Sequence, residues 1–362
     1  MKLTITTIIL FFTCAIFSQN RPQEPKEPFN YTIEDISFTN TKAENIKLAG
    51  TLTLPKNVKK PAVAILISGS GPQDRNESLA GHKPFLVLAD YLTNNGIAIL
   101  RYDDRGTAKS EGDFMSATTF DFATDTEAAV TYLKTRNDID ISKIGLIGHS
   151  EGGLIAPIVA SRNKDIAFLI SLAGTGVDGK IILETQTRRA AELVGAPKSA
   201  IDENEKLTNI IYGAVQKHDT FENIKAEVSS GLKAFKVENP NSQYASLITD
   251  AFIEQQANAV KSSWLQTFIK TDPKDYLSRT TCPILALNGS KDYQVLPKLN
   301  LEAIEIALKK AGNKDVTIKQ LEGLNHLFQT AETGSGQEYA KIEETFSPRA
   351  LVIIKDWILK RF

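Results

Sequence analysis

The chain has 362 residues, with 42 Lys plus Arg, 43 Asp plus Glu and a formal net charge of −1. This near-neutral charge offers no broad electrostatic attraction to nucleic acid, and a hydrophobic content of 42% argues against a disordered chain. The two cysteines, Cys14 and Cys282, cannot form a disulfide framework or a structural zinc site. The length suits one large domain or two smaller ones.

Residues 1–19 have the pattern of a secretory signal peptide. Lys2 gives a positive start, and an apolar run broken by threonines covers residues 5–17. The run is shorter than the ~20 apolar residues of a transmembrane helix, although a short uncleaved anchor is an alternative. We therefore expect export to the periplasm or the medium, with no membrane-spanning segment after cleavage. Proline-rich residues 20–30 indicate an extended leader.

Strand and helix patterns then alternate along the chain. Strands are predicted at residues 31–38, 46–54, 62–68, 97–102, 143–148, 166–172, 283–288 and 316–321. Helices are predicted at residues 85–92, 118–135, 152–162, 301–308 and 351–358. This alternation implies an α/β fold, with a mostly parallel, twisted sheet and helices on both of its faces.

Residues 174–281 interrupt the alternation. They have amphipathic helical character and no clear strand, so we interpret them as a helical insertion into a core formed by residues 31–173 and 282–362. Such an insertion would cover the site as a cap. Five of its aromatic residues are candidates to line a substrate pocket, namely Phe221, Phe235, Tyr244, Phe252 and Trp264.

A candidate nucleophile lies at the end of a predicted strand. Residues 148–152 read Gly-His-Ser-Glu-Gly, which is the G-x-S-x-G pattern of a nucleophile elbow when it joins a strand to a helix. Ser150 is then the nucleophile. The backbone N–H of Glu151, at the helix start, would point at a developing oxyanion. A tight turn with a solvated serine is the simpler alternative.

A serine nucleophile needs a histidine base, and the chain has four histidines. His326 follows the last predicted strand and is the expected base. His149 adjoins Ser150 in the turn and should point away from it, to pack or hydrogen-bond beneath the turn. His82, just after the glycine-rich loop, is a further candidate to line the site, and His218 is expected on the surface of the insertion.

The carboxylate that orients the base is expected between these two residues. Asp292 follows the strand at residues 283–288, where it would accept the imidazole N–H of His326 and fix its tautomer. A turn aspartate that serves local amides is the alternative. The resulting chain order is Ser150, Asp292, His326, which is the order of α/β-hydrolases.

A second oxyanion donor is expected in the glycine-rich loop at residues 68–75. The amide of Ser70 is the first candidate, and that of Gly71 is the substitute. The loop lacks the pattern of a phosphate-binding loop. Asp103 and Arg105, after the next strand, are expected to form ion pairs that support the catalytic loops. No cofactor and no metal are expected, because the carboxylates lack metal-ligand spacing.

Together these segments resemble the α/β-hydrolase superfamily. They are similar to the bacterial carboxylesterases with an S-G-S-G-P-Q-D-R loop, which are grouped with the serine aminopeptidase-like S33 hydrolases. The matching segments are SGSGPQDRNE, RYDDRGTAKSEG, GHSEGG, CPILALNGSKDYQV and NHLFQ. The resemblance implies a serine esterase with Ser150 as nucleophile, Asp292 as acid and His326 as base. Some members carry an additional N-terminal domain, for which we expect no room here.

The expected function is hydrolysis of small carboxylic esters through an acyl-enzyme. One alternative is an exopeptidase acting on short peptides, which needs a carboxylate for the substrate's amino group. The insertion offers Glu184, Glu192, Glu203 and Glu222 for that task. A non-catalytic binding module on the same fold and an acyltransferase are further alternatives.

Overall fold

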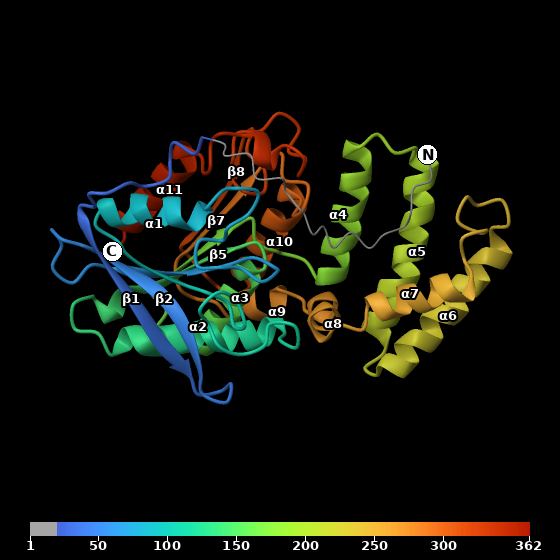
Figure 1. Ribbon diagram of the computed structural model, residues 1–362, viewed down its shortest axis with the longest axis horizontal. Helices are drawn as coiled ribbons and strands as arrows, with labels where there is room; N and C mark the ends of the chain where they lie inside the picture. Colours follow the sequence, from blue (N-terminus) through green and yellow to red (C-terminus); the bar gives the residue numbers. More distant parts are fainter. Residues whose placement is uncertain (1–19) are drawn as a thin grey trace.

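The computed structural model describes residues 20–362, so the predicted signal peptide lies outside the described residues. Eight strands form one sheet (Figure 1). They are β1 (Tyr31–Asn40), β2 (Ile46–Pro55), β3 (Val63–Ile67), β4 (Ala98–Tyr102), β5 (Ile144–His149), β6 (Phe168–Leu172), β7 (Ile284–Gly289) and β8 (Val316–Leu321). Their order across the sheet is β1-β2-β4-β3-β5-β6-β7-β8.

Most neighbouring strands run parallel. The pairs β1–β2 and β2–β4 are antiparallel, and every pair from β4 to β8 is parallel. Parallel strands need helical crossovers, which place helices on the sheet's faces. The core helices are α1 (Pro84–Asn94), α2 (Thr119–Lys134), α3 (Gly152–Arg162), α10 (Pro297–Lys310) and α11 (Pro348–Leu359), with short 3-10 turns at Ile141–Lys143 and Tyr339–Lys341.

Two apolar clusters cover the two faces of the sheet. In β3, Ile65 and Ile67 belong to the cluster with α2, α3 and α10, whereas Ala64 and Leu66 belong to the cluster with α1 and α11. Successive side chains of a strand point to opposite faces, so a run of apolar residues is buried on both. The predicted α/β arrangement is therefore confirmed.

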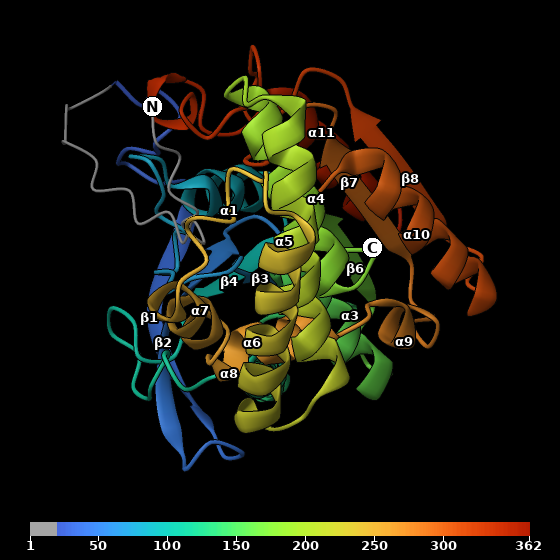
Figure 2. The same ribbon diagram turned by 90° about the vertical axis from the view of Figure 1, so that its right-hand side faces the viewer.

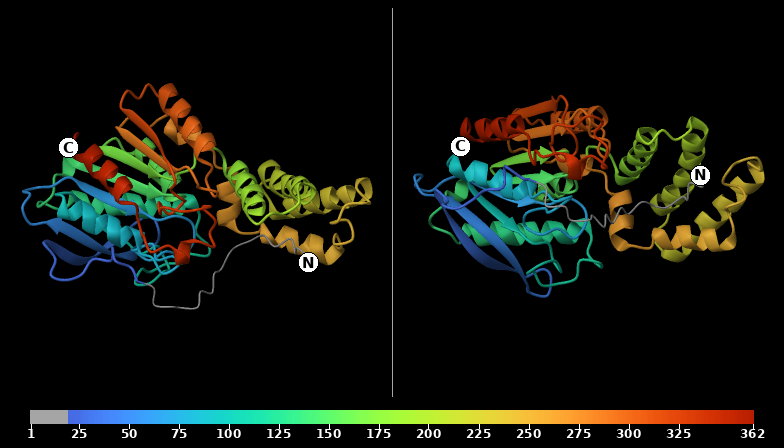
Figure 3. Two further views of the ribbon diagram at one scale, coloured as in Figure 1. Left: turned by 90° about the horizontal axis from the view of Figure 1, so that it is seen from above. Right: turned by 45° about the horizontal axis from the view of Figure 1, so that its top comes forward.

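Six helices lie between β6 and β7 in the chain, and we call residues 179–277 the helical insertion. The helices are α4 (Gly179–Leu193), α5 (Lys198–Lys217), α6 (Phe221–Glu238), α7 (Asp250–Ala259), α8 (Ser263–Lys270) and α9 (Lys274–Leu277). The insertion extends to one side of the sheet, beyond the carboxyl ends of its parallel strands (Figures 1 and 3). Seen from that side, α4 to α8 lie in front of the sheet (Figure 2).

The insertion has a core of its own, and α8 connects it to the sheet. Leu265 and Ile269 pack into the apolar cluster of the insertion, whereas Phe268 packs into the cluster of α2, α3 and α10. A Cβ atom at Gly179 would lie 2.0 Å from the carbonyl oxygen of Phe268, so the start of α4 touches the α8 backbone. The helix α8 thus forms the joint between insertion and core.

Residues 20–30 contain no helix or strand and are packed against the core. The Arg21 guanidinium donates hydrogen bonds to the carbonyl groups of Gly81, Ala340 and Ile342. The Gln23 side chain bonds to the backbone of residues 345–346. The leader thus forms a strap, that is, an extended segment whose hydrogen bonds link the loop near residue 81 to the loop at residues 340–346. Within the described part of the chain, no helix is both long and apolar enough to cross a membrane.

Candidate active site

Ser150 occupies a sharp turn between β5 and α3. Its φ of +52° places it in the left-handed region, and its N–H donates to the carbonyl of Leu172 at 2.9 Å. This conformation costs a non-glycine residue roughly 1–2 kcal/mol. Such strain persists only where surrounding structure enforces it, and here β5, α3 and β6 all contact the turn.

Two glycines allow the strand and the helix to approach this closely. A Cβ atom at Gly148 would lie 2.0 Å from the Gly152 carbonyl oxygen, and one at Gly152 would lie 2.1 Å from the Ile67 carbonyl oxygen. Both contacts are far below van der Waals distance and involve backbone atoms. The G-x-S-x-G spacing therefore has a steric cause in this fold.

His326 and Asp292 meet at the carboxyl end of the sheet. His326 Nδ1 lies 2.7 Å from Asp292 Oδ2, and both residues are buried. The other carboxylate oxygen of Asp292 accepts the N–H groups of Gln294 and Val295 at 2.8 and 3.0 Å. The carboxylate is thus fixed by its own loop. The carboxylate accepts a hydrogen bond from the Nδ1–H of His326, which leaves the unprotonated Nε2 as the ring nitrogen for proton transfer.

His149 joins the serine turn to the His326 loop. Its Nε2 lies 3.0 Å from the His326 carbonyl oxygen, and the two imidazole rings are 4.8 Å apart. Among the hydrogen bonds of residues 20–362, none joins the Ser150 hydroxyl to His326. Catalytic hydrogen bonds of this kind often tighten only when substrate is bound.

The other two histidines, His82 and His218, contact residues away from the serine turn. His82 is buried and bonds to the Thr345 hydroxyl and the Tyr339 carbonyl, so it supports the strap region and does not line the serine turn. His218 follows α5, is partly exposed and lies 3.6 Å from Glu227.

Several backbone N–H groups near Ser150 lack an acceptor among residues 20–362. The glycine-rich loop passes the serine closely, since a Cβ atom at Gly69 would lie 3.1 Å from the Ser150 Cβ. The Gly69 N–H donates to Glu77, whereas the N–H groups of Ser70, Gly71 and Glu151 donate to no acceptor within residues 20–362. Unpaired donors beside a nucleophile suit an oxyanion hole.

Two aspartates from the end of β4 anchor the glycine-rich loop. Asp104 accepts the Ser68 hydroxyl at 2.8 Å and the Gln73 N–H at 3.0 Å. Asp103 accepts two side-chain hydrogen bonds from Arg75, at 3.0 and 2.7 Å. Burial raises the pKa of Asp104 well above its usual range. Two buried aspartates therefore hold the glycine-rich loop in place by hydrogen bonds.

The predicted ion pairs of this region are present, with separate partners. Asp103 pairs with Arg75, and Arg105 pairs with Asp125 of α2 at 2.7 Å. Arg105 and Asp125 are both buried. Each pair therefore ties the loop after β4 to a different element.

Glu77 is a buried neighbour of the serine turn for which the sequence predicts no role. Its Oε1 lies 2.8 Å from His149 Nδ1 and accepts the Gly69 N–H at 2.8 Å. Burial alone would lower the pKa of His149, but the charge of Glu77 and its hydrogen bond outweigh burial and raise that pKa. The position of Glu77 at the end of the SGSGPQDRNE segment was the one feature of the sequence that pointed to a place near the site.

The Glu151 side chain is the second feature that the sequence did not reveal. Its carboxylate accepts hydrogen bonds from Ser70, Thr119 and Trp264. Of the five aromatic residues proposed for a pocket, Trp264 is the one that bonds to the elbow. Phe235 and Tyr244 lie within the insertion's apolar cluster, so they do not face the serine turn.

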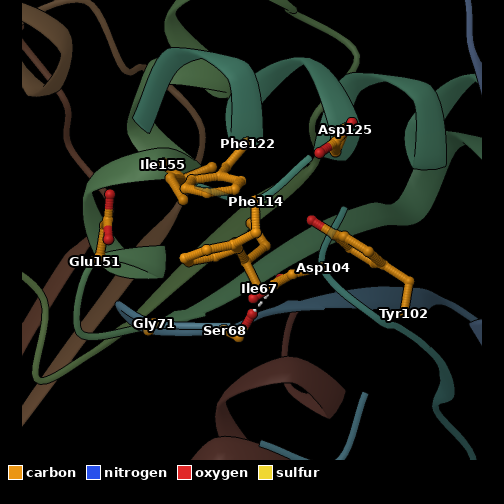
Figure 4. A pocket seen from close by; sticks show the side chains of 11 residues that line it. Ile67, Ser68, Gly71, Tyr102, Asp104, Phe114, Phe122, Asp125, Glu151 and Ile155 are labelled. Atoms are coloured by element: carbon orange, nitrogen blue, oxygen red, sulfur yellow. Dashed lines mark hydrogen bonds between the residues drawn. The ribbon is translucent and has the colours of Figure 1, made fainter. Parts of the chain in front are cut away.

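A small cavity lies beneath the glycine-rich loop, between Asp104 and Glu151 (Figure 4). Its apolar wall includes Phe114, Phe122 and Ile155. It offers about 10 Å³ to the centre of a water molecule, which is room for roughly one water. The cavity is too small for an acyl chain. No group of three or more metal-ligating side chains suited to an ion occurs within residues 20–362.

Comparison with known proteins identifies the family. Residues 83–332 match the family described as serine aminopeptidase, S33, so the chain belongs to this family of α/β hydrolases. It is 25% identical over 353 residues to esterase EstD of Thermotoga maritima, covering 97% of this chain and 73% of that protein.

Solved structures share the fold at low sequence identity. The Pyrococcus furiosus esterase Pf2001 has a TM-score of 0.53 at 15% identity, with 95% of this chain and 100% of that chain covered. The α/β hydrolase GrgF from Penicillium sp. sh18 has a TM-score of 0.53 at 16% identity, with 91% and 99% covered. These similarities define an α/β-hydrolase fold.

Proposed function

We propose that the protein is a serine hydrolase that cleaves small, uncharged carboxylic esters. Ser150 is the nucleophile, His326 the general base and acid, and Asp292 the carboxylate that orients the base. The backbone N–H groups of Ser70 and Glu151 form the oxyanion hole. The observation that carries the proposal is the strained Ser150 turn beside the 2.7 Å His326–Asp292 pair.

The proposed reaction has two acyl-transfer steps. Ser150 Oγ attacks the ester carbonyl carbon while His326 Nε2 takes its proton, and Asp292 stabilises the resulting imidazolium. The tetrahedral oxyanion receives the N–H groups of Ser70 and Glu151. As the intermediate collapses, the alcohol leaves with the proton of His326. Water then repeats the sequence on the acyl-enzyme and releases the acid.

Two further observations support an ester substrate. EstD, which matches most of this chain, is named an esterase. The net charge of −1 gives no bulk attraction for a strongly charged substrate. We assign the helical insertion the role of a cap, because it lies beyond the carboxyl ends of the strands that carry the proposed catalytic residues (Figure 3).

The alternative with a specific observation in its favour is an exopeptidase, since the matched family is described as a serine aminopeptidase. Such an enzyme needs an available carboxylate for the substrate's amino group. Glu184 pairs with Lys180, Glu192 with Arg188, and Glu203 accepts the Ser242 hydroxyl. Three of the four candidate glutamates are thus engaged inside the insertion, which favours the esterase.

The deciding experiment compares two substrate classes on one preparation. The purified protein is assayed with p-nitrophenyl esters and with aminoacyl p-nitroanilides, and is labelled with a fluorophosphonate. We expect ester turnover and stoichiometric labelling, both lost in Ser150→Ala and kept in Ser161→Ala, which alters a serine further along α3. Preferential anilide turnover would establish the exopeptidase. An unlabelled, inactive wild type would indicate a binding module.

Export is a separate proposal that rests on residues 1–19 alone. Expression of the full chain in a bacterial host, followed by fractionation and N-terminal sequencing, tests it. A shortened chain in the periplasm or medium supports cleavage near residue 19. A full-length chain in the cytoplasm would refute export.

A further inference from the structure

The Glu151 carboxylate is buried beside the proposed nucleophile, yet the proposed reaction uses only its backbone N–H. The residue is 2% exposed. Within residues 20–362 no Lys, Arg or His forms an ion pair with it. An ionised carboxylate that is removed from water without a cation needs dense hydrogen bonding to be tolerated. Burial raises the pKa of Glu151, against the opposing effect of its hydrogen-bond donors.

Three neutral donors supply that hydrogen bonding. The Ser70 hydroxyl donates to Oε2 at 2.7 Å, and the Thr119 hydroxyl donates to Oε1 at 2.6 Å. The Trp264 indole N–H is shared between the two oxygens, at 2.8 Å from Oε1 and 3.0 Å from Oε2. Both carboxylate oxygens are therefore occupied. Loss of one donor leaves a buried charge less compensated, which is costlier than the bond itself.

The donors come from three separate segments. Ser70 lies in the glycine-rich loop that carries a proposed oxyanion donor, Thr119 begins α2, and Trp264 lies on α8 of the insertion. Figure 4 shows Glu151 at one edge of the cavity under this loop, with Phe122 of α2 nearby. The Glu151 carboxylate thus connects the insertion to the glycine-rich loop, which carries the proposed oxyanion donor Ser70.

Trp264 is well placed to report the docking of the insertion. It is partly buried against both the apolar cluster of the insertion and that of the sheet. Its ring stacks on Phe268 with centroids 5.5 Å apart. A displacement of α8 therefore moves the indole N–H relative to the elbow, because α8 is the joint between the two cores.

We propose that Glu151 is a positioning residue that couples docking of the helical insertion, through Trp264, to placement of the Ser70 amide in the oxyanion hole. The proposal rests on the serine-hydrolase function above. When Trp264 donates, Glu151 is held and in turn fixes Ser70. When Trp264 withdraws, both carboxylate oxygens lose a donor, Glu151 holds Ser70 less firmly, and the oxyanion hole loses its alignment.

The chain offers a matched pair of variants for the test, because it contains only two tryptophans. Trp264→Phe keeps an aromatic ring on Phe268 and removes the N–H. Trp357→Phe removes the equivalent N–H from α11, where it donates to Thr317 at 3.1 Å, far from the serine turn in the fold. Ser70→Ala is the second test variant, since it removes the hydroxyl and retains the backbone amide.

Kinetics separate positioning from general stability. A lost oxyanion-hole donor costs about 10²–10³ in kcat, so misalignment of one is expected to cost roughly tenfold. We expect Trp264→Phe and Ser70→Ala to lower kcat and the rate of fluorophosphonate labelling by about this factor, with KM nearly unchanged. Trp357→Phe should retain both values. Equal kcat and labelling rates in all three variants and the wild type would overturn the proposal.

Fluorescence gives an independent reading of the same coupling. In Trp357→Phe, all tryptophan emission comes from Trp264, and we expect it to change when a phosphonyl oxygen enters the oxyanion hole of labelled enzyme. In Trp264→Phe, emission from Trp357 should stay constant. An unchanged Trp264 emission on labelling would also contradict the proposal. If the wild type is neither labelled nor active on esters, the proposed function itself has failed.

Discussion

Replacement of Gly152 by alanine tests the steric basis of the serine turn. The added Cβ would lie 2.1 Å from the Ile67 carbonyl oxygen and 2.8 Å from both the Ile67 carbonyl carbon and the Ser68 carbonyl oxygen. All three are backbone atoms, so no side chain can rotate away. To reach an ordinary contact of about 3.5 Å, α3 and the end of β3 must separate by roughly 1.4 Å.

This displacement has two expected consequences. Overpacking costs about 1–3 kcal/mol, so the free energy of unfolding should fall by that amount. The shift also separates Ser150 from the glycine-rich loop that carries Ser70. A misplacement of about 1 Å at a catalytic group costs roughly 10²-fold in rate, and kcat should fall accordingly.

Gly213 provides the control, because it also lies in a helix, α5, but a Cβ there meets nothing within 4 Å. Gly213→Ala should raise the free energy of unfolding by about 0.5–1 kcal/mol and leave ester hydrolysis unchanged. Urea denaturation and p-nitrophenyl ester assays measure both effects. If Gly152→Ala matches the wild type in stability and kcat, the steric account of the turn is wrong.

Four further predictions follow from the site. Asp292→Asn should lower kcat by about 10⁴ in steady-state ester assays. Ser150→Gly should have a free energy of unfolding about 1 kcal/mol higher than that of Ser150→Ala, since glycine relieves the left-handed strain. Its urea midpoint should be higher accordingly, and equal midpoints would argue against strain. Because burial raises the pKa of Glu151, the folded state binds its proton more tightly than the unfolded state. The wild type should therefore lose stability relative to Glu151→Gln as pH rises from about 4 through the raised pKa, and a constant difference would contradict this. Arg105→Met should cost about 3–5 kcal/mol by leaving Asp125 buried without its cation, as calorimetry would show.

The alternation of strands and helices was predictable because each element is specified locally. Residues 62–67 are apolar throughout, and the structure buries β3 on both faces. The Ser150 turn was predictable for the same reason, since its two glycines and the strand and helix that it joins are all adjacent in the sequence. The position of Asp292 and His326 after successive strands followed from the rule that parallel strands end at one edge of the sheet.

Contacts between distant segments were not predictable from these patterns. Trp264 and Glu151 are 113 residues apart, and His149 and Glu77 are 72 apart. Neither pair has a spacing rule, because tertiary packing alone brings the residues together. The residue type of Glu151 was a weak signal, since an acidic side chain between Ser150 and the apolar start of α3 must find donors if it is buried. The contacts of Arg21 with residues 81, 340 and 342 were unpredictable for the same reason.

The bond between His149 and the carbonyl of His326 joins residues 177 positions apart, which has a consequence for how activity arises during folding. A ribosome-bound chain that ends before β8 already contains the serine turn but lacks His326, the base proposed for Ser150. Contacts of such long sequence separation form slowly. If Ser150 is the nucleophile proposed above, it gains its base only when the segment after β8 has folded, and recovery of turnover after denaturation should lag behind recovery of helical content.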